Sequence, residues 1–132
     1  MHDHLTTNYL SKTQKQQYWD EGFLFPISAV SSEQSQAWRE ALETIEHDWL
    51  DSDLPRPLNT YKRVNAHVVM AIAHEIAAHP AILDMVEIIL GPDILLYSTK
   101  FLIKEPQTKH VVTMHQDLAY WGLGGIDGIV TA

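Results

Sequence analysis

The hydrophobic pattern of this chain changes its period once, at Gly91-Pro92, and this change constrains the fold more than any other feature. Before it, apolar residues recur at the spacing of a helix face. After it, residues 94–103 are dense in β-branched and aromatic side chains, with polar residues on one alternating face, which is typical of a strand. The pattern therefore predicts an α+β domain, with helices over residues 1–92 and strands over residues 93–132.

Capping signals divide the first region into helices. Ser11 precedes a helix expected over residues 12–21, and Gly22 follows it as a C-terminal glycine. Ser31, with a glutamine three residues later, predicts the start of a longer amphipathic helix. Two further helices are expected on either side of Pro80, which cannot lie inside a helix but suits its first turn. The tryptophans at helical spacing are expected in the core: Trp19, Trp38 and Trp49.

The second region predicts strands over residues 94–103 and 111–120, and a third that opens at Ile129. Turns are expected over residues 105–109 and over the glycine-rich stretch 122–128. A further short strand is expected at Phe23–Pro26. The residues that follow the helices are enough for only about three or four strands of usual length.

Composition limits the classes of function. The chain has 132 residues, enough for one domain, and its 9 basic against 17 acidic residues give a net charge of −8 without any basic run. Nucleic acid and anionic membranes are therefore not expected as partners. The absence of cysteine leaves only nitrogen and oxygen ligands for a metal. No signal-peptide core or long apolar run is present, so a cytoplasmic protein is expected.

The sequence His115-Gln116-Asp117 holds the most specific arrangement of chemically active residues. Residues i and i+2 of a strand point to the same face, so the imidazole and the carboxylate are expected to converge. One nitrogen and one oxygen ligand make two thirds of a facial triad of two histidines and one carboxylate, the site of non-haem Fe(II) oxygenases. Short motifs of this kind also occur by chance, and the alternative is a strand histidine hydrogen-bonded to a neighbouring carboxylate.

The stretches around this motif resemble the phytanoyl-CoA dioxygenase family, most closely its bacterial small-molecule hydroxylases. The matching stretches are residues 18–24, 75–87, 90–106 and 113–123, which run in the order helix, His-Pro, helix, Gly-Pro, strand, His-x-Asp, Tyr-Trp-Gly. The resemblance implies a double-stranded β-helix of the jelly-roll or cupin-like type. It also implies an enzyme that uses Fe(II), 2-oxoglutarate and O2 to hydroxylate an unactivated C–H bond of a small molecule, with succinate and CO2 as co-products.

The same resemblance assigns roles to individual residues. His115 and Asp117 would be catalytic metal ligands, and the presence of Asp117 favours hydroxylation over the halogenation catalysed by relatives with a small residue there. Arg63 and Lys100 would line the 2-oxoglutarate pocket, although many relatives carry a small residue in place of Lys100. Three residues would line the substrate pocket: His67, Tyr120 and Trp121.

Other clusters of ligand-type residues are expected at the surface. The acidic residues are expected to be a solvated helix end: Glu46, Asp48, Asp51 and Asp53. The remaining histidines are expected to be exposed or to cap helices: His2, His4, His47, His74, His79 and His110.

The chain departs from the family pattern after Asp117, where neither a histidine nor an arginine follows. The family needs both, as third metal ligand and as partner of 2-oxoglutarate, and a β-helix needs about eight strands. We therefore expect the N-terminal portion of a longer enzyme, inactive alone, which self-associates through the apolar edge at residues 129–130 or is completed by a C-terminal half. Two alternatives stay open: a non-catalytic helix and strand module that dimerises, and a cupin-like metal protein that does not use 2-oxoglutarate.

Overall fold

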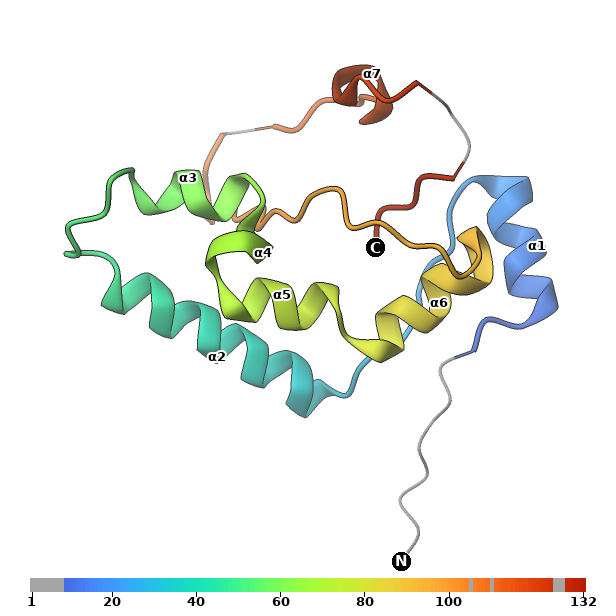
Figure 1. Ribbon diagram of the computed structural model, residues 1–132, viewed down its shortest axis with the longest axis horizontal. Coiled ribbons are helices and arrows are strands. Elements are labelled where there is room, and N and C mark those ends of the chain that lie inside the picture. Colours follow the sequence, from blue (N-terminus) through green and yellow to red (C-terminus); the bar gives the residue numbers. More distant parts are fainter. Residues whose placement is uncertain (1–8, 105, 110, 125–127) are drawn as a thin grey trace, which may run out of the picture.

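The computed structural model describes residues 9–104, 106–109, 111–124 and 128–132. In this part of the chain the architecture is a layer of helices followed by extended chain and one further helical turn (Figure 1). The helices are α1 (Lys12–Glu21), α2 (Ser32–Asp48), α3 (Leu58–Arg63), α4 (Ala66–Val69), α5 (Ala71–Ala77), α6 (Pro80–Leu90) and α7 (Leu118–Trp121). None of these helices is long and apolar enough to cross a membrane.

The predicted helix ends are confirmed where a capping residue marks them. The backbone N–H of Gln14 donates to Ser11 Oγ (3.2 Å), and the Ser11 N–H donates to the Gln14 side chain (2.9 Å), so a full capping box opens α1. Gly22 ends α1 with a φ of 79°, which glycine adopts without strain. Helix α6 begins at Pro80, and the imidazole of His79 caps it, as expected of a capping histidine.

The core lies where α4 and α5 meet α2. Its buried residues are Ala66, Met70, Ile72 and Ala73. Trp38 and Trp49 of the α2 region pack against this cluster, as predicted. The prediction for Trp19 is wrong, because its side chain is 52% exposed on α1.

The expected α+β fold with part of a double-stranded β-helix is contradicted, because the described residues contain helices and no strand. Residues 94–104, which we call the extended segment, do have extended backbone, but they pair with the helical layer at isolated points. The Ala66 N–H donates to the Thr99 carbonyl (3.1 Å), and the Phe101 N–H donates to the Lys62 carbonyl (2.8 Å). A strand requires a neighbouring strand and a ladder of such bonds, and two separate bonds to helix termini do not make one.

The other predicted strands are corrected in the same way. Residues 111–116 form no strand with any described part of the chain, and the end of the predicted strand 111–120 is the helical turn α7, which Gly122 closes at a φ of 66°. Neither 23–26 nor the described chain from Ile129 forms a strand. The predicted turns lie partly outside the described residues, at positions 105 and 125–127.

An ion pair that the sequence pattern did not indicate joins α2 to α3. The ammonium group of Lys62, whose side chain is only 11% exposed, contacts the carboxylate of Glu46, which is 32% exposed. Glu46 is therefore not part of a fully solvated acidic helix end. Because Lys62 also accepts the hydrogen bond from Phe101, it connects α2, α3 and the extended segment.

We expect Glu46→Ala to lower the free energy of unfolding by about 1–2 kcal/mol, because the ammonium of Lys62 would stay largely out of water without its partner. Glu43→Ala on the same helix is the matched control, since its partner Arg39 is 72% exposed and helix propensity changes equally. The control is expected to change stability by less than about 0.5 kcal/mol. Urea denaturation of both variants measures the difference, and equal midpoints would show that the Lys62 pair contributes no more than a surface pair.

Candidate metal centre

The structure brings the side chains of His115 and Asp117 together. His115 Nε2 lies 3.1 Å from Asp117 Oδ1, and the two side chains are 39% and 49% exposed. The convergence arises at the junction between extended chain and a helical turn rather than on a strand, because Asp117 is the residue that precedes α7. One nitrogen donor and one oxygen donor therefore face each other at a solvent-accessible position.

A backbone carbonyl orients the imidazole of His115. Its Nδ1 lies 2.7 Å from the carbonyl oxygen of Thr113, and because a carbonyl only accepts, Nδ1 carries the proton of this bond. The bond to Thr113, together with a smaller contribution from the negative charge of Asp117, raises the pKa of His115 against a desolvation effect of opposite sign. The Nε2 atom either holds a proton shared with Asp117 or is free for a cation. A metal ion and a proton therefore compete for the same position.

The carboxylate of Asp117 is not used to cap its own helix. Asp117 makes no side-chain capping bond, whereas its backbone carbonyl accepts the Tyr120 N–H at 2.9 Å. The backbone of Asp117 is thus held by α7 while its carboxylate oxygens stay available as ligands.

One of the two aromatic side chains of α7 lies beside the pair. The ring of Tyr120 stands edge-on to His115 with a centroid distance of 6.3 Å, and Tyr120 is 77% exposed. Trp121 instead packs against Tyr97 of the extended segment, with ring centroids 5.3 Å apart. The substrate-pocket roles expected for Tyr120 and Trp121 stay predictions.

The segments that carry the residues expected near 2-oxoglutarate lie side by side. The bond between Phe101 and the Lys62 carbonyl places the end of α3, which carries Arg63, beside Lys100, and both cations are exposed. His67 lies next to them, since its backbone N–H and its Nδ1 approach Thr99 Oγ1 at 2.8 and 2.9 Å. Thr99 was not singled out by sequence, because a threonine in a β-branched run has no feature that separates it from its neighbours.

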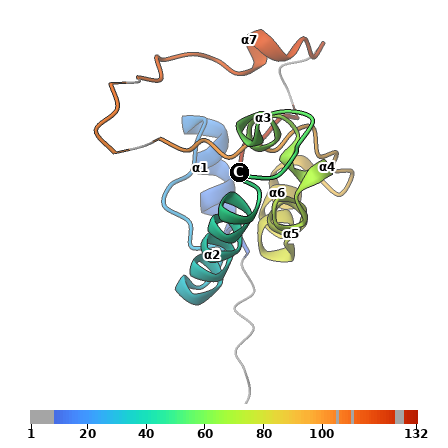
Figure 2. The same ribbon diagram turned by 90° about the vertical axis from the view of Figure 1, so that its left-hand side faces the viewer.

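Among the described residues, no hydrogen bond or ion pair joins the pair His115 and Asp117 to the residues expected near 2-oxoglutarate, which are Arg63, His67 and Lys100. Figure 1 and Figure 2 both place α7 on the side of α3 that faces away from α2. The roles of Arg63, His67 and Lys100 stay predictions.

The donor set fits two positions of a metal site. In the described part of the chain no group of three histidine, aspartate or glutamate side chains lies close enough to hold a metal ion. His115 and Asp117 supply the nitrogen and oxygen ligands that divalent iron accepts, and a third ligand would have to come from elsewhere.

Comparison with known proteins adds one match. A family model described as phytanoyl-CoA dioxygenase (PhyH) matches residues 18–131, which include every residue of the two groups above. No similar curated protein and no similar solved structure was found.

Proposed function

Since the chain belongs to the phytanoyl-CoA dioxygenase family, we propose that it forms part of a non-haem oxygenase that uses Fe(II), 2-oxoglutarate and O2. The reaction we propose is hydroxylation of an unactivated C–H bond in a small molecule, with succinate and CO2 as co-products. The family match supports dioxygenase chemistry as a class, and the finer assignment rests on the residues below.

The observation that carries the proposal is the 3.1 Å approach of His115 Nε2 to Asp117 Oδ1. Two ligands two residues apart can chelate one cation, and Thr113 already holds the imidazole in the orientation that presents Nε2. A histidine ligand whose other ring nitrogen donates to a backbone carbonyl is the common arrangement in metal sites. The imidazole of His115 therefore carries a proton on Nδ1 already and needs no change of tautomer to bind a metal through Nε2.

The roles of the residues follow from their chemistry. His115 and Asp117 would hold the iron, which when bound supplies the O2 activation that side chains cannot perform. Arg63 and Lys100 would bind a carboxylate of 2-oxoglutarate through charge-assisted hydrogen bonds. Three residues would form the wall that orients the substrate: His67, Tyr120 and Trp121.

No third histidine, aspartate or glutamate among the described residues joins His115 and Asp117 in a metal-binding group. The chain alone is then expected to bind metal weakly and to form no succinate. We further propose a cytoplasmic enzyme for a small-molecule substrate. The net charge of −8 argues against a CoA thioester, whose phosphates require cations.

Iron-dependent formation of succinate from 2-oxoglutarate, measured in the intact enzyme, tests the proposal. Metal binding without consumption of 2-oxoglutarate would instead indicate a cupin-like metal protein. Absence of metal binding would indicate a non-catalytic module that folds or dimerises.

Replacing Arg63 or Lys100 with alanine is expected to raise the KM for 2-oxoglutarate by about tenfold or more while metal affinity is unchanged, because a cation that holds a carboxylate contributes binding rather than iron ligation. Arg56→Ala, in the exposed loop before α3, is the matched control and is expected to leave the KM unchanged. Steady-state kinetics with varied 2-oxoglutarate measures the effect. Unchanged KM in both variants would place the co-substrate pocket elsewhere.

A further inference from the structure

Helix α7 cannot be stable on its own. It is a single turn of four residues, Leu118–Trp121, and a turn of this length gains too few hydrogen bonds to offset the entropy of ordering it. No side-chain cap supports its start, since the carboxylate of Asp117 contacts His115 and makes no capping bond. The position of Asp117 relative to His115 therefore depends on contacts that come from outside the turn.

The structure contains such a contact between the end of α7 and the extended segment. The ring of Tyr97 packs on the ring of Trp121 with a centroid distance of 5.3 Å and an interplanar angle of 37°. The Tyr97 hydroxyl also approaches the backbone carbonyl of Trp121, at 3.4 Å. The two residues are 24 positions apart, so the contact joins parts of the chain that are distant in sequence.

The extended segment itself is attached to the helical layer. Two positions after Tyr97, the Thr99 carbonyl accepts the Ala66 N–H, and Ala66 is fully buried in the core. A continuous chain of contacts thus leads from the core through Thr99 and Tyr97 to Trp121 and α7. Tyr120 and His115 are only five positions apart, so their edge-on contact does not connect α7 to the helical layer.

We propose that Tyr97 is a positioning residue for the candidate metal centre: through Trp121 it holds α7 in place and so keeps the carboxylate of Asp117 within reach of His115. The inference rests on the proposed function for its catalytic meaning and goes beyond it by naming a residue that touches neither metal nor co-substrate. The loss of an aromatic pair changes the population of an ordered segment by up to about tenfold, which is large enough to measure in a single helical turn.

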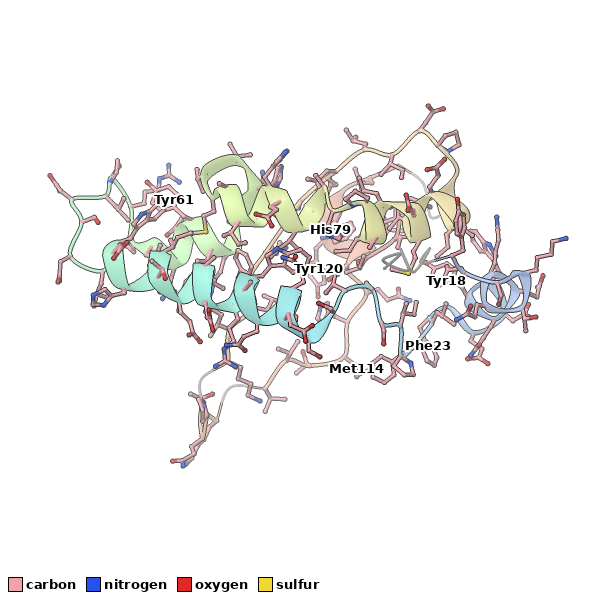
Figure 3. The ribbon with its side chains drawn as sticks, turned by 90° about the horizontal axis from the view of Figure 1, so that it is seen from below. Tyr18, Phe23, Tyr61, His79, Met114 and Tyr120 are labelled. Carbon is pink, nitrogen blue, oxygen red and sulfur yellow. The ribbon has the colours of Figure 1, made fainter. Side chains whose placement is uncertain are left out.

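Three variants of the full chain test this role. Tyr97→Ala removes the ring, and Tyr97→Phe keeps the ring but removes the long hydroxyl contact. Tyr18→Ala is the matched control, because Tyr18 makes a comparable ring contact with Trp19 (5.5 Å) on α1, and Figure 3 shows Tyr18 well apart from Tyr120 of α7.

The first measurement is hydrogen exchange of the peptide that contains residues 118–121. In Tyr97→Ala the Ala119 and Tyr120 amides, which donate to Gln116 and Asp117, are expected to exchange about tenfold faster, as the loss of an aromatic contact predicts. Tyr97→Phe and Tyr18→Ala are expected to stay within about threefold of the unmodified chain. Unchanged exchange in Tyr97→Ala overturns the proposal, whether or not the chain binds metal.

The second measurement is titration with Co(II), observed by its visible absorption, as a stand-in for Fe(II). Tyr97→Ala is expected to bind Co(II) about tenfold more weakly, with Tyr97→Phe restoring the affinity. Faster exchange together with unchanged Co(II) affinity overturns the positioning role. If the unmodified chain and the His115→Ala variant have equal affinity for Co(II), the proposed metal centre fails instead, and the exchange data then decide whether Tyr97 orders α7.

Discussion

Alanine at position 115 or 117 is expected to lower the affinity of the chain for a divalent metal by about 100-fold or more and to abolish succinate formation by the intact enzyme. Each substitution removes one of the two ligands that approach each other at 3.1 Å, and a single exposed side chain does not chelate. The Asp117 variant is also expected to lose the negative charge that offsets the charge of the cation. Co(II) titration and a succinate assay measure the two effects.

Matched controls separate loss of a ligand from loss of structure. His47→Ala and Asp93→Ala remove exposed residues of the same types far from the pair in sequence and are expected to keep the metal affinity of the parent chain. Thermal unfolding of all four variants should show similar midpoints, because His115 and Asp117 are both well exposed. Retained succinate formation in His115→Ala or Asp117→Ala would refute the assignment of these residues as metal ligands.

Met70→Ala is expected to lower the free energy of unfolding by about 3 kcal/mol, the typical loss when a fully buried methionine side chain leaves a cavity. Met70 is 1% exposed and is the largest fully buried side chain among the described residues. It lies between α4 and α5, so its loss affects the contact between these helices and the packing of Trp38 and Trp49 around them.

The matched control for this variant is Met114→Ala. Met114 is 100% exposed in the extended chain before His115, and Figure 3 shows its side chain at the periphery of the molecule. Its replacement is expected to change stability by less than about 0.5 kcal/mol. Equal urea midpoints for the two variants would show that the α4 and α5 contact is not the core of the fold.

Features that depend on residues close in sequence could be predicted from the sequence. Helix ends at Ser11, Gly22 and Pro80 were predicted correctly, because a cap or a proline acts through bonds to residues three or four positions away. The approach of His115 to Asp117 was also predicted, but the sequence placed it on a strand, whereas in the structure Asp117 has helical backbone at the start of α7. What the periodic pattern did not reveal is that the predicted strand 111–120 ends in the helical turn α7.

The contacts between segments that are distant in sequence could not be predicted from the sequence. The pairing of Lys62 with Glu46, the packing of Tyr97 on Trp121 and the bond from His67 to Thr99 join residues that are 16, 24 and 32 positions apart. No local spacing encodes such contacts, because they depend on how helices pack and not on the period of one element. The first of these contacts joins α2 to α3, and the other two attach the extended segment to the helical layer and to α7.

The sequence by itself determined the helix ends that a cap or a proline marks, which residues have strand-like composition, and that a nitrogen and an oxygen ligand stand two positions apart. Only the tertiary structure decided that residues 94–104 attach to helix termini instead of forming a sheet, and that α7 meets the extended segment through Trp121. The physical reason is that a helix satisfies its hydrogen bonds within one segment, whereas a strand is defined by a partner that its own residues do not contain.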